Sequence, residues 1–225
     1  MSAEKYNARQ VTIAIDDLRI SGDLSIPTDS HAIVLFAHGS GSSRFSPRNR
    51  FVADGLNDAH LATILIDLLT PEEENVDNIT RQYRFDIPLL TERVLGAVDW
   101  LANDDDTRHL AIGLFGASTG AAAALQAAAR NPASVAAVVS RGGRPDLAGN
   151  LLYEVEAPTL LIVGENDPVV IELNRDSLQK LACTRELVIV PGATHLFEEP
   201  GKLEEVAHLT AEWFARHLLA HKARI

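Results

Sequence analysis

Ser118, Asp167 and His195 have the types and the chain order needed for nucleophilic catalysis. A serine hydroxyl becomes a good nucleophile when a histidine removes its proton, and that histidine needs a carboxylate to orient it. Ser118 is the centre of "GASTG" (116–120), which matches the pattern G-x-S-x-G. In proteins with a nucleophile elbow, the three groups follow one another as serine, then acid, then histidine. The sequence therefore predicts a catalytic triad.

The residues around Ser118 favour a sharp turn between a strand and a helix. The apolar run "HLAIGLF" (109–115) predicts a buried strand, and an alanine-rich run follows Gly120 at once. Small residues two places before and after the serine let the strand and helix backbones pass closely, and the helix directs its N-terminal N–H groups at the hydroxyl. The alternative is a glycine-bounded turn whose serine caps the helix. A phosphate loop is disfavoured because Ala121 stands where that loop needs lysine.

The proposed acid and base lie in two later loops. Asp167 follows the predicted strand 158–164, and His195 follows the predicted strand 185–191. Both loops come after strands, as Ser118 does, so all three residues are expected at the same edge of a parallel sheet. Asp167 could instead cap the next helix, with Pro168 at its first position. Glu165 is a rival acid in the same loop.

A glycine-rich loop supplies candidate donors for an oxyanion hole. "HGSG" (38–41) follows the predicted strand 32–38. A tetrahedral intermediate needs two N–H donors aimed at its negatively charged oxygen. We expect the amides of Thr119 and Ser40 to serve, and we expect His38 to pack within the turn. An ordinary flexible turn is the alternative.

The rest of the sequence predicts an α/β fold. A β-hairpin is expected over 11–15 and 18–27, around Asp16 and Asp17. Further strands are predicted at 32–38, 61–67, 109–115, 134–140, 158–164 and 185–191, and helices at 49–60, 88–104, 169–182, 203–222 and directly after Ser118. This alternation predicts a mainly parallel sheet with helices on both faces and a ligand site at the carboxyl ends of the strands. The segment 70–87 is long for a loop and is expected to form a small lid or pocket wall.

Composition narrows the class of protein. The length of 225 residues favours a single domain over 1–225, and a formal net charge of −11 argues against a nucleic-acid partner. A single cysteine, Cys183, excludes an internal disulfide and fits a reducing compartment. The first residues have no apolar core of a signal peptide, and no apolar run approaches the length of a membrane span. We therefore expect a soluble, cytoplasmic protein with no membrane partner.

The motifs "HGSGSS", "GASTG", "GENDPVV" and "GATHLFEEPG" resemble those of the α/β-hydrolase superfamily, and within it the short, capless proteins grouped with dienelactone hydrolases. The resemblance implies an eight-stranded, mostly parallel sheet without a separate cap domain, and hydrolysis through an acyl-enzyme. Its nucleophile, acid and base map to Ser118, Asp167 and His195. Dienelactone hydrolases have cysteine at the elbow, whereas this chain has serine. Some similar proteins are joined to phosphoribosyltransferase domains, and we expect no such domain within these residues.

These observations predict a serine hydrolase that cleaves a small ester, thioester or lactone without a metal or organic cofactor. Arginines gather in loops at the carboxyl edge, and arginine binds carboxylate and phosphate well. We expect Arg44, Arg141 and Arg144 to contact an anionic substrate; other arginines of these loops are Arg48, Arg50, Arg81 and Arg84. The alternative is that they pair with "PEEE" (71–74) and Asp146. An acyltransferase with the same triad and a non-catalytic binding protein are the other functions considered, and the sequence leaves the oligomeric state open.

Overall fold

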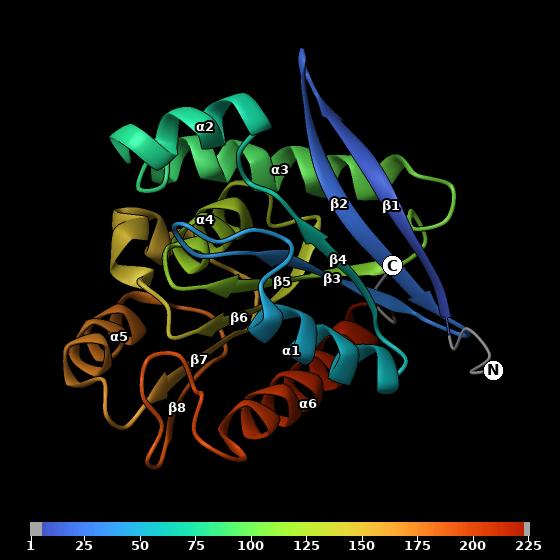
Figure 1. The fold of residues 1–225 in the computed structure, drawn as a ribbon. Coiled ribbons are helices and arrows are strands. Elements are labelled where there is room, and N and C mark those ends of the chain that lie inside the picture. Colours follow the sequence, from blue (N-terminus) through green and yellow to red (C-terminus); the bar gives the residue numbers. More distant parts are fainter. Residues whose placement is uncertain (1–5, 223–225) are drawn as a thin grey trace.

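The computed structural model describes residues 6–222, which form one mixed sheet with helices packed on it (Figure 1). Its eight strands lie in the order β1-β2-β4-β3-β5-β6-β7-β8. Their bounds are β1 (Tyr6–Ile15), β2 (Leu18–Pro27), β3 (Ala32–Ala37), β4 (Ala62–Ile66), β5 (Ala111–Ala117), β6 (Val135–Arg141), β7 (Thr159–Gly164) and β8 (Arg185–Val190). β1 and β2 form an antiparallel hairpin, and β2 runs antiparallel to β4. The other neighbouring pairs are parallel, so β4, β3, β5, β6, β7 and β8 all run in one direction. The predicted strands are confirmed, and β1 begins five residues earlier than the apolar pattern indicated.

The central strands are apolar throughout because both of their faces are covered. In β3, Ile33 and Leu35 contribute to the core on one side of the sheet, whereas Val34 and Phe36 contribute to the core on the other. Successive side chains of a strand point to opposite faces, so a strand between two helical layers has no solvent-exposed face and no need for polar alternation. This arrangement fixes the position of the carboxyl ends of β3, β5, β6, β7 and β8.

The helices divide between the two faces of the sheet. Their bounds are α1 (Pro47–Asp58), α2 (Pro71–Thr80), α3 (Ile87–Asn103), α4 (Thr119–Arg130), α5 (Pro168–Lys180) and α6 (Lys202–Lys222), with a 3₁₀ segment η1 (Pro145–Glu154). α1 and α6 cover one face, α3 and α4 cover the other with η1, and α5 contacts β7 and β8 (Figure 1). The ring of Phe214 in α6 fits over Gly113 of β5, where a Cβ would lie 2.7 Å from it.

Most of the segment 70–87 is the helix α2, and the predicted pocket wall is confirmed, because Glu74, Asp77 and Arg84 line a cavity together with Ser40. The Thr70 hydroxyl accepts the Glu73 N–H, and the Glu73 carboxylate accepts the Thr70 N–H, which is a capping box. Glu73 also pairs with Arg93 and so ties α2 to α3. The 3₁₀ segment η1 was not expected from the sequence.

No segment between residues 6 and 222 forms a separate cap domain over the carboxyl edge of the sheet. Across the same residues, we find no helix that combines the length and the apolar character needed to cross a membrane. The loops at the carboxyl edge are therefore the place to look for a functional site.

Candidate active site

Ser118 has a strained backbone at the junction of β5 and α4. Its φ and ψ angles are 50° and −120°, which a residue with a side chain rarely adopts. Although Ser118 occupies the N-cap position of α4, its hydroxyl makes no capping hydrogen bond. A serine that served only as a helix cap would use its hydroxyl for that purpose. The structure therefore favours the elbow over the capping alternative.

The two glycines of the elbow allow three backbone segments to meet. A Cβ on Gly116 would lie 2.3 Å from Cα of Ala121, and a Cβ on Gly120 would lie 2.3 Å from the carbonyl oxygen of Ala37. Both distances are shorter than any real contact of a methyl group. Glycine is needed at these positions because α4 begins directly against the ends of β3 and β5.

Asp167 and His195 form a hydrogen-bonded pair. Nδ1 of His195 lies 2.6 Å from Oδ2 of Asp167. An ionised carboxylate only accepts hydrogen bonds, so this contact favours the tautomer that carries its proton on Nδ1 and has a lone pair on Nε2. Asp167 occupies the N-cap position of α5 but makes no side-chain capping bond there. The carboxylate is therefore assigned to the histidine, and capping alone does not explain it.

The rival acid Glu165 has a different partner. Its Oε2 accepts the N–H of Gly192 at 2.7 Å, which ties the loop after β7 to the loop after β8.

The His195 ring also packs against Gly142, where a Cβ would lie 3.5 Å from both Cε1 and Nδ1. Gly142 has a φ of 51°, so the loop after β6 suits a residue without a side chain there.

Ser118 and His195 line one cavity of about 220 Å³. Its wall also contains Ser40, Arg48 and Arg141. No hydrogen bond joins the Ser118 hydroxyl to His195 within residues 6–222. In enzymes without bound substrate, such hydrogen bonds are often long and tighten when substrate binds. The structure thus brings the three predicted residues to one edge and places the hydroxyl and the imidazole on the same cavity.

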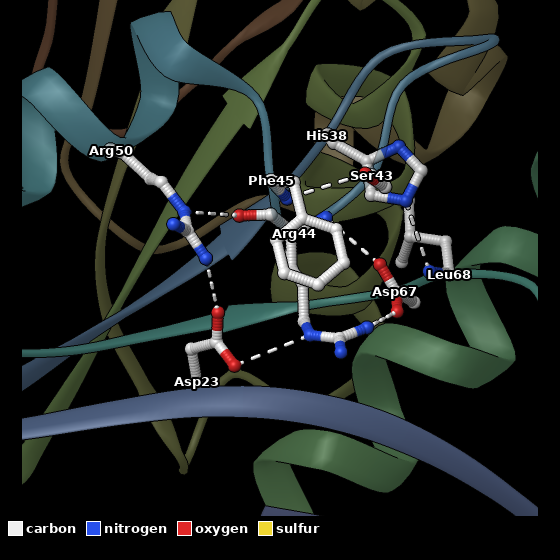
Figure 2. A network of polar contacts seen from close by, with 8 residues as sticks. All are labelled: Asp23, His38, Ser43, Arg44, Phe45, Arg50, Asp67 and Leu68. Atoms are coloured by element: carbon white, nitrogen blue, oxygen red, sulfur yellow. Dashed lines mark hydrogen bonds and ion pairs between the residues drawn. The ribbon is translucent and has the colours of Figure 1, made fainter. Parts of the chain in front are cut away.

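The loop that carries Ser40 is anchored at its two ends (Figure 2). At the first end, Nδ1 of His38 lies 2.9 Å from the Gly39 carbonyl oxygen, and Nε2 of the same ring accepts the Leu68 N–H. Burial lowers the pKa of His38, so its ring is neutral and structural, as predicted. At the second, the Arg44 guanidinium pairs with Asp67 and Asp23, and the Arg44 N–H donates to Asp67 at 2.8 Å.

The two predicted oxyanion donors are engaged differently. Thr119 is the first residue of α4, where an N–H has no acceptor within the helix. The Ser40 N–H, by contrast, donates to the Thr119 hydroxyl at 2.9 Å. Gly39 lies against the nucleophile, because a Cβ there would be 3.0 Å from Cβ of Ser118. Both amides are therefore next to Ser118, and one of them has a partner in the absence of substrate.

Two of the three arginines predicted to contact substrate have structural partners instead. Arg44 holds the loop described above and does not line the cavity of Ser118. Arg144 forms two 2.8 Å hydrogen bonds with Asp146, which raise its pKa. These pairings favour the alternative that the two guanidinium groups bind carboxylates of the chain, and substrate contact by Arg44 and Arg144 stays a prediction. Arg50 and Arg84 also pair with aspartates, at 2.6 Å each.

Arg141, the third predicted arginine, lines the cavity of Ser118, and so does Arg48. Arg141 is only 6 % exposed; among residues 6–222, its guanidinium makes a single hydrogen bond, to Asn49 at 3.1 Å, and its Nε has no partner. Burial, with a smaller effect from Arg48, lowers the pKa of Arg141 to about 10. Arg48 pairs with Glu198 at 2.7 Å, yet its Nε is also buried without a partner. The cavity wall thus holds two neighbouring cations with unused donors. The sequence did not single out Arg48, because its position on the wall of this cavity depends on the folded structure.

Comparison with known proteins gives the family. The sequence pattern of the dienelactone hydrolase family matches residues 57–219. The chain belongs to this family. A solved structure of a dienelactone hydrolase from Anabaena variabilis superposes with a TM-score of 0.94 at 56 % sequence identity, covering 96 % of this chain and 100 % of that one. The α/β-hydrolase fold predicted from the sequence is thereby confirmed.

Two further comparisons place this dienelactone hydrolase family member among its relatives. Est1E from Butyrivibrio proteoclasticus shares the fold, with a TM-score of 0.76 at 16 % identity over 92 % of this chain and 98 % of that one. Two Mycobacterium tuberculosis proteins, each named "Putative phosphoribosyl transferase", are 54 % identical over 209 residues. That match covers 93 % of this chain but 46 % of theirs, so the chain spans about half the length of these curated relatives.

Proposed function

We propose that this dienelactone hydrolase family member is a serine hydrolase that cleaves a small ester, thioester or lactone through an acyl-enzyme. The observation that carries the proposal is the 2.6 Å contact between Asp167 and His195, whose ring lines the same cavity as the strained Ser118. If these residues served only to cap helices or to pack the loops, the arrangement of base, acid and hydroxyl would have no explanation.

The proposed reaction has two stages. Nε2 of His195 takes the proton of Ser118 as its Oγ attacks the acyl carbon, and the ring then returns that proton to the leaving oxygen or sulfur. In the second stage, His195 takes a proton from water, the hydroxide attacks the acyl carbon, and the acid leaves as Ser118 regains its proton. Asp167 stays ionised and stabilises the imidazolium.

The amides next to the nucleophile would stabilise the oxyanion. The Thr119 N–H, at the N-terminus of α4, adds the positive end of a helix dipole. We propose Ser40 as the second donor, with its N–H moving from the Thr119 hydroxyl to the oxyanion.

Arg141 and Arg48 support an anionic group on the substrate. Arg141 is a buried cation without a carboxylate partner among residues 6–222, which is unfavourable, and the unused Nε donors of Arg141 and of the partly exposed Arg48 suit a carboxylate or phosphate. Glu198 neutralises Arg48 from the exposed side but makes no contact with Arg141. We therefore propose that the anion of the substrate binds at Arg141, within the cavity of Ser118.

Two other functions use the same site. An acyltransferase would result if an alcohol or amine replaced water in the second stage, and a binding protein would result if no acyl-enzyme formed. The transferase name of the mycobacterial relatives describes proteins about twice as long. We propose hydrolysis for the part that this chain spans, because the family that matches it is the dienelactone hydrolase family.

The test is turnover of 4-nitrophenyl esters, thioesters and lactones by the wild-type chain and by Ser118→Ala. The variant is expected to lose at least about 10³-fold in kcat while its melting temperature is unchanged. Ser177→Ala is the matched control, because its hydroxyl only bonds Leu173 within α5. Equal turnover by the Ser118 variant would refute the proposal, and faster product formation with an added alcohol or amine would favour the acyltransferase.

A further inference from the structure

The Thr119 side chain lies between the nucleophile and the loop of Ser40. Its Oγ1 accepts the Ser40 N–H at 2.9 Å, and the residue is only 4 % exposed. Thr119 directly follows Ser118 and begins α4. One residue therefore supplies a predicted oxyanion donor from its backbone and binds the other predicted donor with its side chain.

Ser40 has little else to hold its amide in place. Its loop is anchored at His38 and at Arg44, and Gly41 between them has a φ of 69°. Ser42 donates back to the Gly39 carbonyl at 3.2 Å, which closes a turn around Ser40 without binding it. Among the hydrogen bonds of residues 6–222, the one to Thr119 is the only one made by Ser40.

We propose that Thr119 is a positioning residue whose hydroxyl aims the Ser40 amide at the oxyanion site. This inference rests on the proposed hydrolase function. In one threonine, Oγ1 and the amide nitrogen are joined through Cα and Cβ only, so the Ser40 N–H is directed at the same end of α4 as the Thr119 N–H. Oxyanion donors contribute most when they are oriented before the reaction.

The hydroxyl can hold the amide without blocking it. A hydrogen bond to a charged oxygen is stronger than one to a neutral hydroxyl. As negative charge develops on the acyl oxygen, the Ser40 N–H therefore exchanges the Thr119 hydroxyl for the oxyanion, and no covalent bond of Thr119 changes. Threonine suits this role because a β-branched side chain has few rotamers at the start of a helix.

The test compares Thr119→Val, which removes the hydroxyl but keeps the shape, with Thr119→Ser, which keeps the hydroxyl. We expect Thr119→Val to lower kcat about tenfold with KM within about twofold, which is less than the effect of deleting a donor. Inhibition by phenylboronic acid, whose tetrahedral adduct with Ser118 fills the oxyanion hole, should weaken by the same factor. Thr119→Ser should retain both properties.

Two controls separate positioning from folding. Thr210→Val removes a buried hydroxyl that bonds Val206 within α6, and it should leave kcat and inhibition unchanged. If Thr119→Val lowers the melting temperature strongly, Thr119→Ala takes its place and should show the same loss of kcat. Unchanged or higher kcat and boronate affinity in the variants lacking the hydroxyl would overturn the inference. A wild-type chain without Ser118-dependent turnover would instead refute the proposed function.

Discussion

Replacing Arg141 with methionine should make the protein more stable and, at the same time, less selective for anionic substrates. Arg141 is 6 % exposed and has no carboxylate partner within residues 6–222. A pKa lowered to about 10 corresponds to about 3 kcal/mol of unfavourable free energy for keeping the charge in the folded state. Because the pKa of this base is depressed, the penalty is present at every pH below about 10.

The expected change in stability follows from two opposing effects. Methionine removes the buried charge but also the hydrogen bond to Asn49, which contributes about 1 kcal/mol. The net gain of about 2 kcal/mol should raise the melting temperature of the unliganded protein by about 4–8 °C. Differential scanning calorimetry at pH 7 measures this directly. Arg144→Met is the matched control, since it breaks a pair with Asp146 and should lower stability slightly.

The same variant should lose its preference for anionic substrates. A hydrogen bond to a charged group contributes about 1.5–3 kcal/mol, so the preference should fall at least about tenfold. The assay compares kcat/KM for mono-4-nitrophenyl adipate with that for 4-nitrophenyl hexanoate, whose acyl chains have equal length. Unchanged selectivity together with a lower melting temperature would show that Arg141 serves the fold alone, and the reasoning from its unused Nε would be refuted.

Two further substitutions test the geometry of the site. Asp167→Asn should lower kcat by about 10³–10⁴-fold with little change in melting temperature, because an amide no longer fixes the His195 tautomer; kcat within tenfold of wild type would exclude that role. Gly120→Ala should destabilise the protein by about 3 kcal/mol or more, since its Cβ would lie 2.3 Å from the Ala37 carbonyl oxygen. Gly149→Ala, which meets no atom within 4 Å, should lose about 1–2 kcal/mol from its positive φ alone, and equal losses of the two variants in urea denaturation would contradict the steric argument.

The fold was predictable where local pattern and final environment agree. The apolar run at β3 is buried on both faces, as its sequence suggests, and the elbow glycines mark a real crossing of backbones. α2 was missed although Thr70 and Glu73 have the spacing of a capping box, because its acidic composition gives a weak apolar stripe. η1 contains Gly149 with a non-helical backbone, so no helical period extends across it.

The partners of the loop arginines could not be predicted from the sequence. Arg44 pairs with Asp67 and Asp23, which lie 23 and 21 residues away along the chain, the first directly after β4 and the second within β2. Such pairings depend on sheet order, which a list of charges does not contain. The proposed triad residues could be predicted because each follows a recognisable strand, whereas the lack of a carboxylate partner at Arg141 follows from where the folded chain buries it.

We propose that Ser118 is the nucleophile and that His195 and Asp167 activate it. The most direct measurement is reaction with a fluorophosphonate probe, followed by digestion and mass spectrometry of the labelled peptide. We expect one adduct per chain, on Ser118, with labelling at least about 10²-fold slower in His195→Gln. A folded wild-type protein that remains unlabelled, or that carries the adduct on another residue, would contradict it.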